Sequence, residues 1–306
     1  MSAHFAASPE QERLSGTELW PWRRELLRLG GAPADFDWLL DLAGGVDGHS
    51  RHRLRLQPEL SVVLGCSLGE IEGLWHRHLS EKIPLQYLVG VCPWRDLELL
   101  VGPGALIPRQ ETELLVELAL EHARALPAGW PRRWADLGSG SGCLAVALAL
   151  AFPEAQGCAV DCSAEALHHT DANLQRAGVR GRVAQLKGSW WAPLEVVWGQ
   201  LDLVLSNPPY IPSADVSLLD PVVRWHEPHL ALDGGADGLD AVRSIAAGAL
   251  QALAPGGWLL LEHHHDQSSA VCSLLSAAGL EAVVAHKDLE GHCRFVQARR
   301  PLSLDD

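Results

Sequence analysis

From residue 133 onward, short apolar runs alternate with stretches of helical periodicity, and this alternation restricts the possible fold more than any other feature of the chain. Strands that alternate with helices form a parallel sheet covered by helices on both faces. The last two runs are joined by the short segment KDLEGH, so the final strand is expected to run antiparallel to its neighbour. The pattern predicts a doubly wound α/β sheet with strands at RWADL, QGCAVD, RVAQLK, LDLVLS, GWLLLE, LEAVVAH and CRFVQAR.

The part of the chain before this sheet has a different character. Residues 1–82 show short helical patterns broken by Pro and Gly, and Ser67 with Glu70 forms a capping-box pattern. Residues 83–108 carry two β-prone pieces, around 90–95 and 97–101, which predict a hairpin. A helix is expected from about residue 111 to 126. We therefore predict a helical domain over 1–82, a β-hairpin linker over 83–108 and the α/β domain over 109–306.

Composition and charge argue against several classes of protein. The chain has 306 residues, of which 47% are hydrophobic, so it can bury the core of one large domain or two modest ones. Its formal net charge of -14 disfavours duplex DNA as a partner. The seven cysteines include no C-x-x-C pair, which favours a reducing cytoplasm over a disulfide framework or a zinc ribbon. No targeting segment is evident, and no apolar run reaches the ~18 residues of a membrane span.

A glycine-rich turn follows the first strand of the predicted sheet. The motif DLGSGSG places three glycines directly before a helix, where they let the backbone approach a ligand closely. A nicotinamide-binding turn requires Gly or Ala where Cys143 stands. Asp136 repels a pyrophosphate but suits a ligand with an ammonium or sulfonium group. The turn therefore indicates S-adenosylmethionine, with these candidate binding residues: Asp136, Gly138, Ser139, Gly140, Ser141 and Gly142.

A second acid stands at the end of the next strand. Asp161 follows Asp136 by about 25 residues, a spacing at which a carboxylate can accept hydrogen bonds from both ribose hydroxyls of a nucleoside. The alternative is that the glycines form only a tight turn and the acid only caps a helix. Two acids at these two places favour the ligand-binding interpretation.

The stretch LVLSNPPYIPS ends the fourth strand with a polar amide and two prolines. Asn207 is thereby delivered to the carboxyl edge of the sheet, where open α/β folds hold ligands. Pro208 and Pro209 fix the backbone, so the Pro208 carbonyl and the Asn207 side-chain oxygen are expected to face one small space. Two acceptors suit an NH2 group, and Tyr210 offers an aromatic face for a planar amide or base. These four residues are the catalytic candidates, with Asn207 also beside the cofactor, although Asn-Pro-Pro is also a good structural turn.

Six segments together resemble the HemK/PrmC family of glutamine methyltransferases, which modify the Gly-Gly-Gln loop of peptide-chain release factors. The resemblance covers about residues 80–300 and is more specific than an Asn-Pro-Pro-Tyr motif alone. The segments are IPLQYLVG, LIPRQETELLVE, DLGSGSG, SNPPYI, VRWHEPHLALDGGADGLD and GGWLLLEHHHDQ.

The resemblance implies a seven-stranded methyltransferase domain that uses S-adenosylmethionine. It implies methylation of the amide nitrogen (N5) of a release-factor glutamine. From the resemblance together with the composition, we expect a cytoplasmic, monomeric enzyme that binds no nucleic acid and no membrane. Residues 138–142 and Asp161 would hold the cofactor, Trp190 would border its adenine, and residues 207–210 would hold the glutamine. The helical N-terminal domain and the hairpin would grip the release factor.

The chain departs from the family pattern at two places. Ser189 stands where the family often has Asp, so a carboxylate for the adenine amino group is missing and only a weaker hydroxyl acceptor remains. His264 replaces a Gly in the run of three histidines at 263–265, but only two of these share a face of a strand, so no metal site is expected. Arg109 and Glu113 either pair with each other or line the cofactor entrance.

Other functions stay open from the residues alone. The same Asn-Pro-Pro-Tyr turn suits a glutamine of a ribosomal protein, or the exocyclic amine of adenine in DNA, which the acidity of the chain disfavours. A methyltransferase fold that serves as an inactive adaptor is a second alternative, disfavoured by the presence of Asp136, Asp161 and Asn207. A dinucleotide-dependent oxidoreductase is the third, disfavoured by Asp136 and Cys143.

Overall fold

The computed structural model describes residues 12–302 and consists of two units. The first unit contains the chain up to Val91 together with Pro221–His226, and the second contains Cys92–Asp220 and the chain from Glu227 onward. The division after Val91 falls inside the segment predicted as a linker. The domain limits at residues 82 and 108 stay predictions, and what is expected of residues 1–11 and 303–306 lies outside the described part of the chain.

The first unit is mainly helical. Its core contains Phe36 and Trp75, which are fully buried and meet edge to face with ring centroids 5.0 Å apart. The predicted capping box is confirmed: Ser67 Oγ accepts from the Glu70 amide and the Glu70 carboxylate accepts from the Ser67 amide. A short antiparallel sheet of β1 and β2 is not predicted by the sequence, since three-residue strands show no clear alternation. The elements are β1 (Arg13–Ser15), α1 (Gly16–Arg28), α2 (Pro33–Leu42), α3 (Gly48–Leu56), β2 (Ser61–Val63), α4 (Leu68–Glu81), α5 (Leu85–Val89) and α10 (Pro221–His226).

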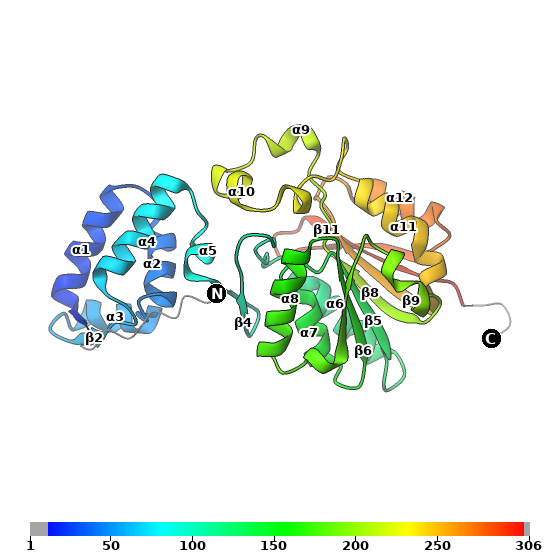
Figure 1. Cartoon of the computed structure of the whole chain (residues 1–306), viewed down its shortest axis with the longest axis horizontal. Coiled ribbons are helices and arrows are strands. Elements are labelled where there is room, and N and C mark those ends of the chain that lie inside the picture. The colour runs from blue at the N-terminus through cyan, green and yellow to red at the C-terminus, as the bar shows by residue number, and fades with distance from the viewer. Residues whose placement is uncertain (1–11, 303–306) are drawn as a thin grey trace. The chain divides into compact units, whose positions relative to one another are not determined.

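The second unit is built on a sheet of seven strands in the order β10-β11-β9-β8-β5-β6-β7 (Figure 1). The strands from β7 to β9 pair in parallel, and β11 is antiparallel to both of its neighbours, as predicted for the end of the chain. The fold class is therefore confirmed. The strands are β5 (Arg133–Leu137), β6 (Gln156–Asp161), β7 (Val183–Lys187), β8 (Leu201–Ser206), β9 (Leu253–Glu262), β10 (Glu281–Lys287) and β11 (Cys293–Arg299).

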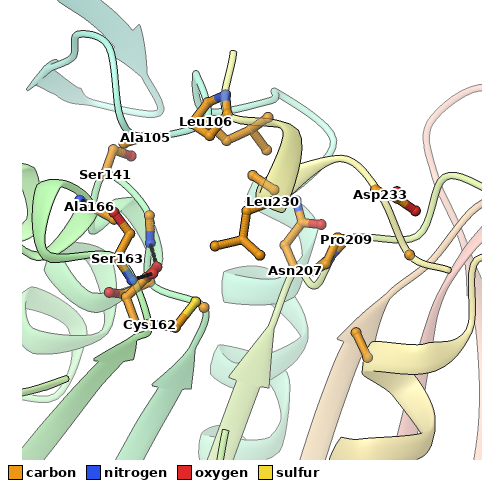
Figure 2. Close-up of a pocket in the computed structure, with 18 of the residues that line it drawn as sticks. Ala105, Leu106, Ser141, Cys162, Ser163, Ala166, Asn207, Pro209, Leu230 and Asp233 are labelled. Atoms are coloured by element: carbon orange, nitrogen blue, oxygen red, sulfur yellow. Dashed lines mark hydrogen bonds between the residues drawn. The ribbon is translucent and has the colours of Figure 1, made fainter. Parts of the chain in front are cut away.

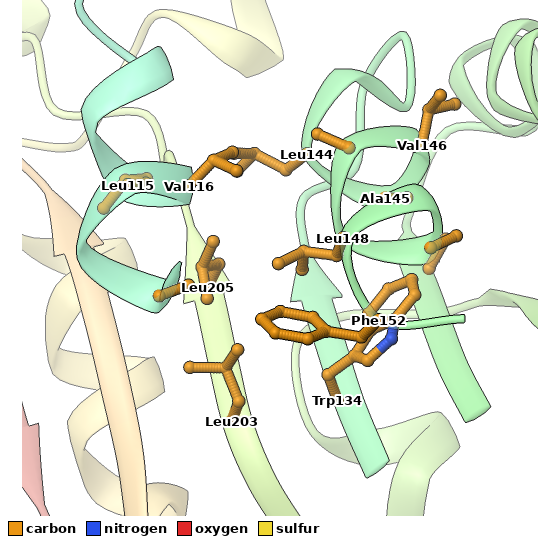
Figure 3. Close-up of a cluster of buried hydrophobic side chains, with 14 of the residues drawn as sticks. Leu115, Val116, Trp134, Leu144, Ala145, Val146, Leu148, Phe152, Leu203 and Leu205 are labelled. Atoms are coloured by element: carbon orange, nitrogen blue, oxygen red, sulfur yellow. The ribbon is translucent and has the colours of Figure 1, made fainter. Parts of the chain in front are cut away.

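Alternate residues of the central strands enter separate cores on the two faces of the sheet. On β8, Leu203 and Leu205 enter one core and Val204 enters the other. On β5, Trp134 and Ala135 divide in the same way. Burial on both faces explains why these strands read as continuous apolar runs. Figure 3 shows the first core, in which residues of β5 and β8 pack against helices on one face of the sheet.

Helices cover both faces of the sheet. α6 (Glu113–Ala125), α7 (Cys143–Ala151) and α8 (Ala164–Arg176) supply the core on one face. α11 (Asp240–Ala252) and α12 (Ser268–Ala277) supply the core on the other. Short helices lie in the connections, namely η1 (Arg180–Arg182), η2 (Ala192–Val197), α9 (Ser213–Val216) and η3 (His229–Ala231).

The predicted element boundaries differ from the observed ones by a few residues. β9 begins at Leu253 rather than at Gly257, and α6 spans Glu113–Ala125 rather than 111–126. The two β-prone pieces form β3 (Val91–Trp94) and β4 (Leu97–Leu100), which pair as a two-stranded sheet.

The strand order reverses direction at β5. The chain runs outward from β5 to β6 and β7, and then returns to place β8 on the other side of β5. Open α/β sheets bind ligands beyond the carboxyl ends of the strands at such a switch point. The ends of β5, β6 and β8 therefore mark the expected site. Within residues 12–302, no helix is long and apolar enough to cross a bilayer.

Candidate active site

A cavity of about 540 Å³ lies at the carboxyl ends of β5, β6 and β8. Figure 2 shows Asn207 and Pro209 on one side of it and Cys162, Ser163 and Ala166 on the other. The remaining walls come from residues 104–109, the glycine-rich turn, residues 188–190 and the segment 228–235. Residues far apart in the sequence thus meet at the predicted edge of the sheet.

The glycine-rich turn adopts a conformation that requires glycine. Gly138, Gly140 and Gly142 have φ angles of 77°, 55° and 84°, in the left-handed region that residues with a Cβ avoid. A Cβ on Gly142 would also lie 3.0 Å from the Cα of Thr170 on α8. Gly138, Ser139, Gly140 and Ser141 line the cavity, whereas Gly142 does not and is instead the N-cap residue that precedes α7.

Asp161 holds the turn and the next segment together. Its Oδ2 accepts a hydrogen bond of 2.9 Å from the Gly140 amide, and its Oδ1 accepts one of 2.9 Å from the Ser163 amide. Both carboxylate oxygens are thereby fixed at the edge of the cavity. Each oxygen keeps further lone pairs, so Asp161 can accept from a ligand without releasing the backbone.

Asp136 is a buried acid with one oxygen that has no partner. The residue is 1% exposed and lines the cavity. Its Oδ2 accepts a hydrogen bond from the Ala145 amide at 3.1 Å. Oδ1 has no hydrogen-bond partner among the described residues. Burial, with a contribution from the charge of Asp161, raises the pKa of Asp136 to about 8. A buried, unpaired acceptor of this kind suits a cationic group of a ligand.

Trp190 lies against the glycine-rich turn. Its ring carbon Cζ3 is 3.5 Å from the position of a Cβ on Gly138, and its φ of 48° is left-handed. Non-glycine residues held in this region cost free energy and gather at functional sites. Gly188 and Ser189 line the cavity next to it, so the segment forms a wall beside the turn.

Asn207 is oriented by a chain of hydrogen bonds at the carboxyl ends of β8 and β9. Its Nδ2 donates to Thr112 Oγ1 at 2.9 Å, and Thr112 Oγ1 donates to Glu262 Oε2 at 2.7 Å. Thr112 and Glu262 are each 2% exposed. Because the Asn207 amide nitrogen is committed to Thr112, the carboxamide oxygen is left for another donor.

The other three residues of the Asn-Pro-Pro-Tyr turn are placed unevenly. Pro209 lines the cavity together with Asn207, whereas Pro208 is buried and is not among the lining residues. Tyr210 does not line the cavity either; its hydroxyl donates to Glu262 Oε1 at 3.4 Å. The predicted roles of Pro208 as an acceptor and of Tyr210 as a stacking surface stay predictions.

The segment after this turn folds back onto it. The Ile211 amide donates to the Leu232 carbonyl at 3.0 Å, and the Gly234 amide donates to the Ile211 carbonyl at 2.8 Å. This pairing brings Leu230 to the cavity, and Figure 2 shows its side chain between Asn207 and Ser163 in the view drawn. The exposed side chain of Leu230 thus adds to the apolar part of the cavity lining.

Arg109 pairs with Glu227 rather than with Glu113. Arg109 Nη2 lies 2.7 Å from Glu227 Oε1, and Glu227, which is 5% exposed, also accepts from the Ile107 amide. Glu113 instead accepts from the Arg95 amide at 2.9 Å. Of the two predicted roles for Arg109, pairing with Glu113 is wrong, and Arg109 lines the cavity.

Sequence reasoning assigned no role to Thr112, Glu262 or Glu227. Glu262 carried a usable signal, since an acid at the end of a predicted strand is what identified Asp161. Burial is the main cause that raises the pKa of Glu262 to about 7. Nearby, His263 is buried and His264 Nδ1 lies 2.6 Å from Asp266. In the part of the chain that the structure describes, no cluster of three or more His, Cys, Asp or Glu suits a metal ion.

Comparison with known proteins places the chain among methyltransferases. A family model described as "Methyltransferase small domain" matches residues 112–235. The catalytic domain of hMettl16 has a similar fold, with a TM-score of 0.52 at 14% identity over 77% of this chain and 83% of that one. At this identity the likeness concerns the fold alone.

Curated relatives match over nearly the whole chain. A protein of Prochlorococcus marinus is 48% identical over 94% of this chain and 98% of its own length. A protein of Synechocystis is 40% identical over 94% of this chain and 97% of its own. Both carry the name "Release factor glutamine methyltransferase".

Proposed function

The chain belongs to the release factor glutamine methyltransferase family, and we propose that its cavity transfers a methyl group from S-adenosylmethionine to the side-chain amide nitrogen (N5) of the glutamine in a release factor's Gly-Gly-Gln motif. The observation that carries this proposal is the orientation of Asn207, whose carboxamide nitrogen is tied to Thr112 at the wall of a cavity that also holds Asp136 and Asp161. A free amide oxygen there is an acceptor for the NH2 group of a substrate amide.

The residues present suit S-adenosylmethionine. The unpartnered Oδ1 of Asp136 fits its ammonium group, and the fixed carboxylate of Asp161 fits two ribose hydroxyls. The glycine-rich turn has no bulky side chains, so a ligand can lie close to its backbone. Ser189 and Trp190 would border the adenine. When bound, the cofactor would supply a methyl group activated by a sulfonium, and loss of that methyl group would break the S–C bond and leave a neutral thioether.

Asn207 prepares the acceptor nitrogen. An amide nitrogen is a poor nucleophile because its lone pair is delocalised into the carbonyl group. A hydrogen bond from the substrate N–H to the Asn207 oxygen favours the pyramidal nitrogen and stabilises the positive charge that develops there as the new N–C bond forms. One N–H proton then leaves to solvent. Positioning supplies most of the rate, since an in-line displacement needs little acid or base catalysis.

The other candidate functions are not favoured. Relatives at 40–48% identity over most of the chain carry the release-factor name, and none of these names mentions a ribosomal protein or DNA. We extend the proposal to a monomeric enzyme that acts in the cytoplasm without nucleic acid. Gel filtration with light scattering tests the monomer, and a dimer would contradict it.

Mass spectrometry of the product tests the activity directly. The protein is incubated with labelled S-adenosylmethionine and, separately, with release factor, ribosomal proteins and DNA. We expect one added methyl on the glutamine of the Gly-Gly-Gln loop and no label in the other two pools. Label confined to ribosomal protein or DNA would contradict the proposed substrate.

We propose that the N-terminal helical unit, with the hairpin of β3 and β4, grips the release factor away from the methylated loop. Hydrogen exchange of the complex tests this role. Slower exchange is expected in α1 to α5 when release factor is added, and unchanged exchange throughout these helices would contradict it.

Replacing Ser189 with Asp is expected to tighten cofactor binding about fivefold, because a carboxylate accepts a stronger hydrogen bond from the adenine amino group than a hydroxyl does. Isothermal titration calorimetry with S-adenosylmethionine measures the change. Ser189→Ala, the matched control, is expected to weaken binding slightly. An unchanged Kd in both variants would show that residue 189 does not face the adenine.

Cofactor binding at pH 7 is expected to release protons. Burial raises the pKa of Asp136 from its ordinary value of 3.8 to about 8, so at a pH between these values Asp136 is protonated in the folded protein but ionised in the unfolded chain. The free energy of unfolding therefore falls as the pH rises through this range. An ammonium group beside Oδ1 favours the ionised form and drives the proton off. Calorimetry in two buffers of different ionisation enthalpy measures the release, and Asp136→Asn should remove it. Equal heats in both buffers for the unsubstituted protein would contradict the contact.

A further inference from the structure

We propose that Thr112 and Glu262 are positioning residues for methyl transfer, because their hydrogen bonds decide which end of the Asn207 carboxamide faces the substrate. The inference rests on the proposed function and adds two side chains to it, neither of which is offered as a group that touches the substrate.

The side chains of Asn207, Thr112 and Glu262 come from three separate parts of the fold and are joined by two consecutive hydrogen bonds. Asn207 follows β8, Thr112 precedes α6 and Glu262 ends β9. Asn207 Nδ2 donates to Thr112 Oγ1 at 2.9 Å, and Thr112 Oγ1 donates to Glu262 Oε2 at 2.7 Å. Thr112 and Glu262 are almost completely buried, so water does not substitute for either partner.

Thr112 has no local structural use for its hydroxyl. It is the N-cap residue of α6, a position at which Thr side chains commonly accept from the helix backbone. In this chain the side chain makes no capping hydrogen bond. Its hydroxyl is instead used in the contacts with Asn207 and Glu262, which is unexpected for a residue that serves only to start a helix.

The direction of each hydrogen bond between Asn207, Thr112 and Glu262 follows from the number of protons that these side chains can donate. An ionised Glu262 can only accept, so the single proton of the Thr112 hydroxyl is committed to it. Thr112 can then only accept from Asn207, which must turn its NH2 group toward Thr112 and leave its oxygen free. The oxygen is the end that an incoming NH2 group requires.

Protonation of Glu262 removes this constraint. A neutral carboxyl can donate to Thr112, whose own proton then becomes available to the Asn207 oxygen. The Asn207 carboxamide can turn over and present NH2 to the NH2 group of the substrate, where donor meets donor. The productive orientation is therefore guaranteed only when Glu262 is ionised.

The surroundings of Glu262 place this change near neutral pH. Burial raises the pKa of Glu262 to about 7; the nearby charge of Glu111 adds to this, while the hydrogen bond from Thr112 and the charge of Arg294 on β11 oppose it.

The Glu262 carboxylate has a second hydrogen-bond donor. The Tyr210 hydroxyl donates to its Oε1 at 3.4 Å. The Cys143 thiol on α7 also senses this carboxylate: burial first, and then the charges of Asp136 and Glu262, raise the pKa of the thiol. Burial is the first cause that lowers the pKa of His263, the next residue along the chain. The carboxylate thus holds both polar side chains of the Asn-Pro-Pro-Tyr turn, Asn207 through Thr112 and Tyr210 directly.

Matched variants of Thr112 test the role in catalysis. Thr112→Val keeps the shape of the side chain and removes the hydroxyl; we expect kcat for release-factor methylation to fall about 30-fold, with Kd for S-adenosylmethionine within about twofold. Thr112→Ser keeps the hydroxyl and is expected to restore most of the lost rate. Loss of rate in both variants, or in neither, would overturn the assignment.

The pH profile separates positioning from a merely structural role. For the unsubstituted protein, kcat should fall below an apparent pKa near 7, and Thr112→Ser should keep this acid limb. Glu262→Gln and Thr112→Val should give low and flat profiles, because neither retains the titrating contact to Asn207. An unaltered acid limb in either of these two variants would contradict the proposal.

A spectroscopic readout makes the inference independent of the substrate. In the protein alone, the side-chain NH2 resonances of Asn207 in nuclear magnetic resonance should shift as the pH passes through about 7, and the shift should persist in Thr112→Ser but vanish in Thr112→Val. If these resonances behave as expected while release factor is not methylated, the proposed function fails and the positioning stands. If methylation occurs but the resonances do not respond to pH or to Thr112→Val, the positioning fails alone.

Discussion

Replacing Asn207 with Ala is expected to lower kcat for release-factor methylation about 1000-fold while leaving Kd for S-adenosylmethionine within about threefold. The variant removes the carboxamide whose nitrogen is held by Thr112 and, through it, by Glu262, and with it the oxygen proposed to accept from the substrate. Removal of one preorganised polar group that stabilises charge in a transition state costs about 100- to 1000-fold in rate. The acids and the glycine-rich turn that suit the cofactor are untouched. Single-turnover methylation and calorimetry measure the two quantities separately.

Gln200→Ala is the matched control, since it removes a carboxamide from the opposite end of β8, away from the cavity. Its kcat is expected to equal that of the unsubstituted protein. Asn207→Ala that keeps more than a tenth of the original kcat would show that the carboxamide does not hold the acceptor nitrogen. A large loss of cofactor affinity in the same variant would instead assign Asn207 to the cofactor.

Replacing Asp161 with Asn is expected to raise Kd for S-adenosylmethionine about 100-fold. The substitution is nearly isosteric, but both carboxylate oxygens accept from backbone amides, at Gly140 and at Ser163. An amide group offers one oxygen and one NH2, so a donor must face one of these N–H groups. The variant therefore loses acceptors for the ribose and disturbs the turn at once, each at a cost of about 1 to 3 kcal/mol.

Saturating cofactor should recover most of kcat in this variant, because the segment that follows Asp161 lies on the other side of the cavity from Asn207 (Figure 2). Asp171→Asn is the control: it makes the same chemical change on α8, where Asp171 pairs with Arg180 outside the cavity. An unchanged Kd in Asp161→Asn would remove the acid from the cofactor site, and a Kd raised equally in the control would point to a general effect on folding.

Much of the fold and part of the candidate site could be predicted from the sequence. A strand buried on both faces appears as an apolar run, and a recognisable motif or polar residue marks its end. Asp136 was identified beside the glycine-rich turn, Asp161 at the end of β6 and Asn207 in the Asn-Pro-Pro turn after β8, and all three line the same cavity. Parallel strands bring their carboxyl ends to one edge of the sheet, so local signals were enough to predict a shared location.

Contacts within the site could not be predicted in this way. Thr112 is separated from Asn207 by 95 residues and from Glu262 by 150. The pairing of Arg109 with Glu227 spans 118 residues, and sequence proximity had suggested Glu113 instead. Nothing local distinguishes a Thr that caps a helix from one that orients a distant amide.

By itself, therefore, the sequence determined the order of strands and helices, the conformation of the glycine-rich turn and the presence of polar groups at the strand ends. These properties depend on side-chain periodicity and on backbone sterics, which act over a few residues. Only the tertiary structure decided which buried polar groups are hydrogen-bonded to one another and which of them donates. The Asn207 oxygen is available to a substrate because the Thr112 hydroxyl accepts from the amide nitrogen and donates its own proton to the Glu262 carboxylate. Such pairings exist only once the sheet has assembled.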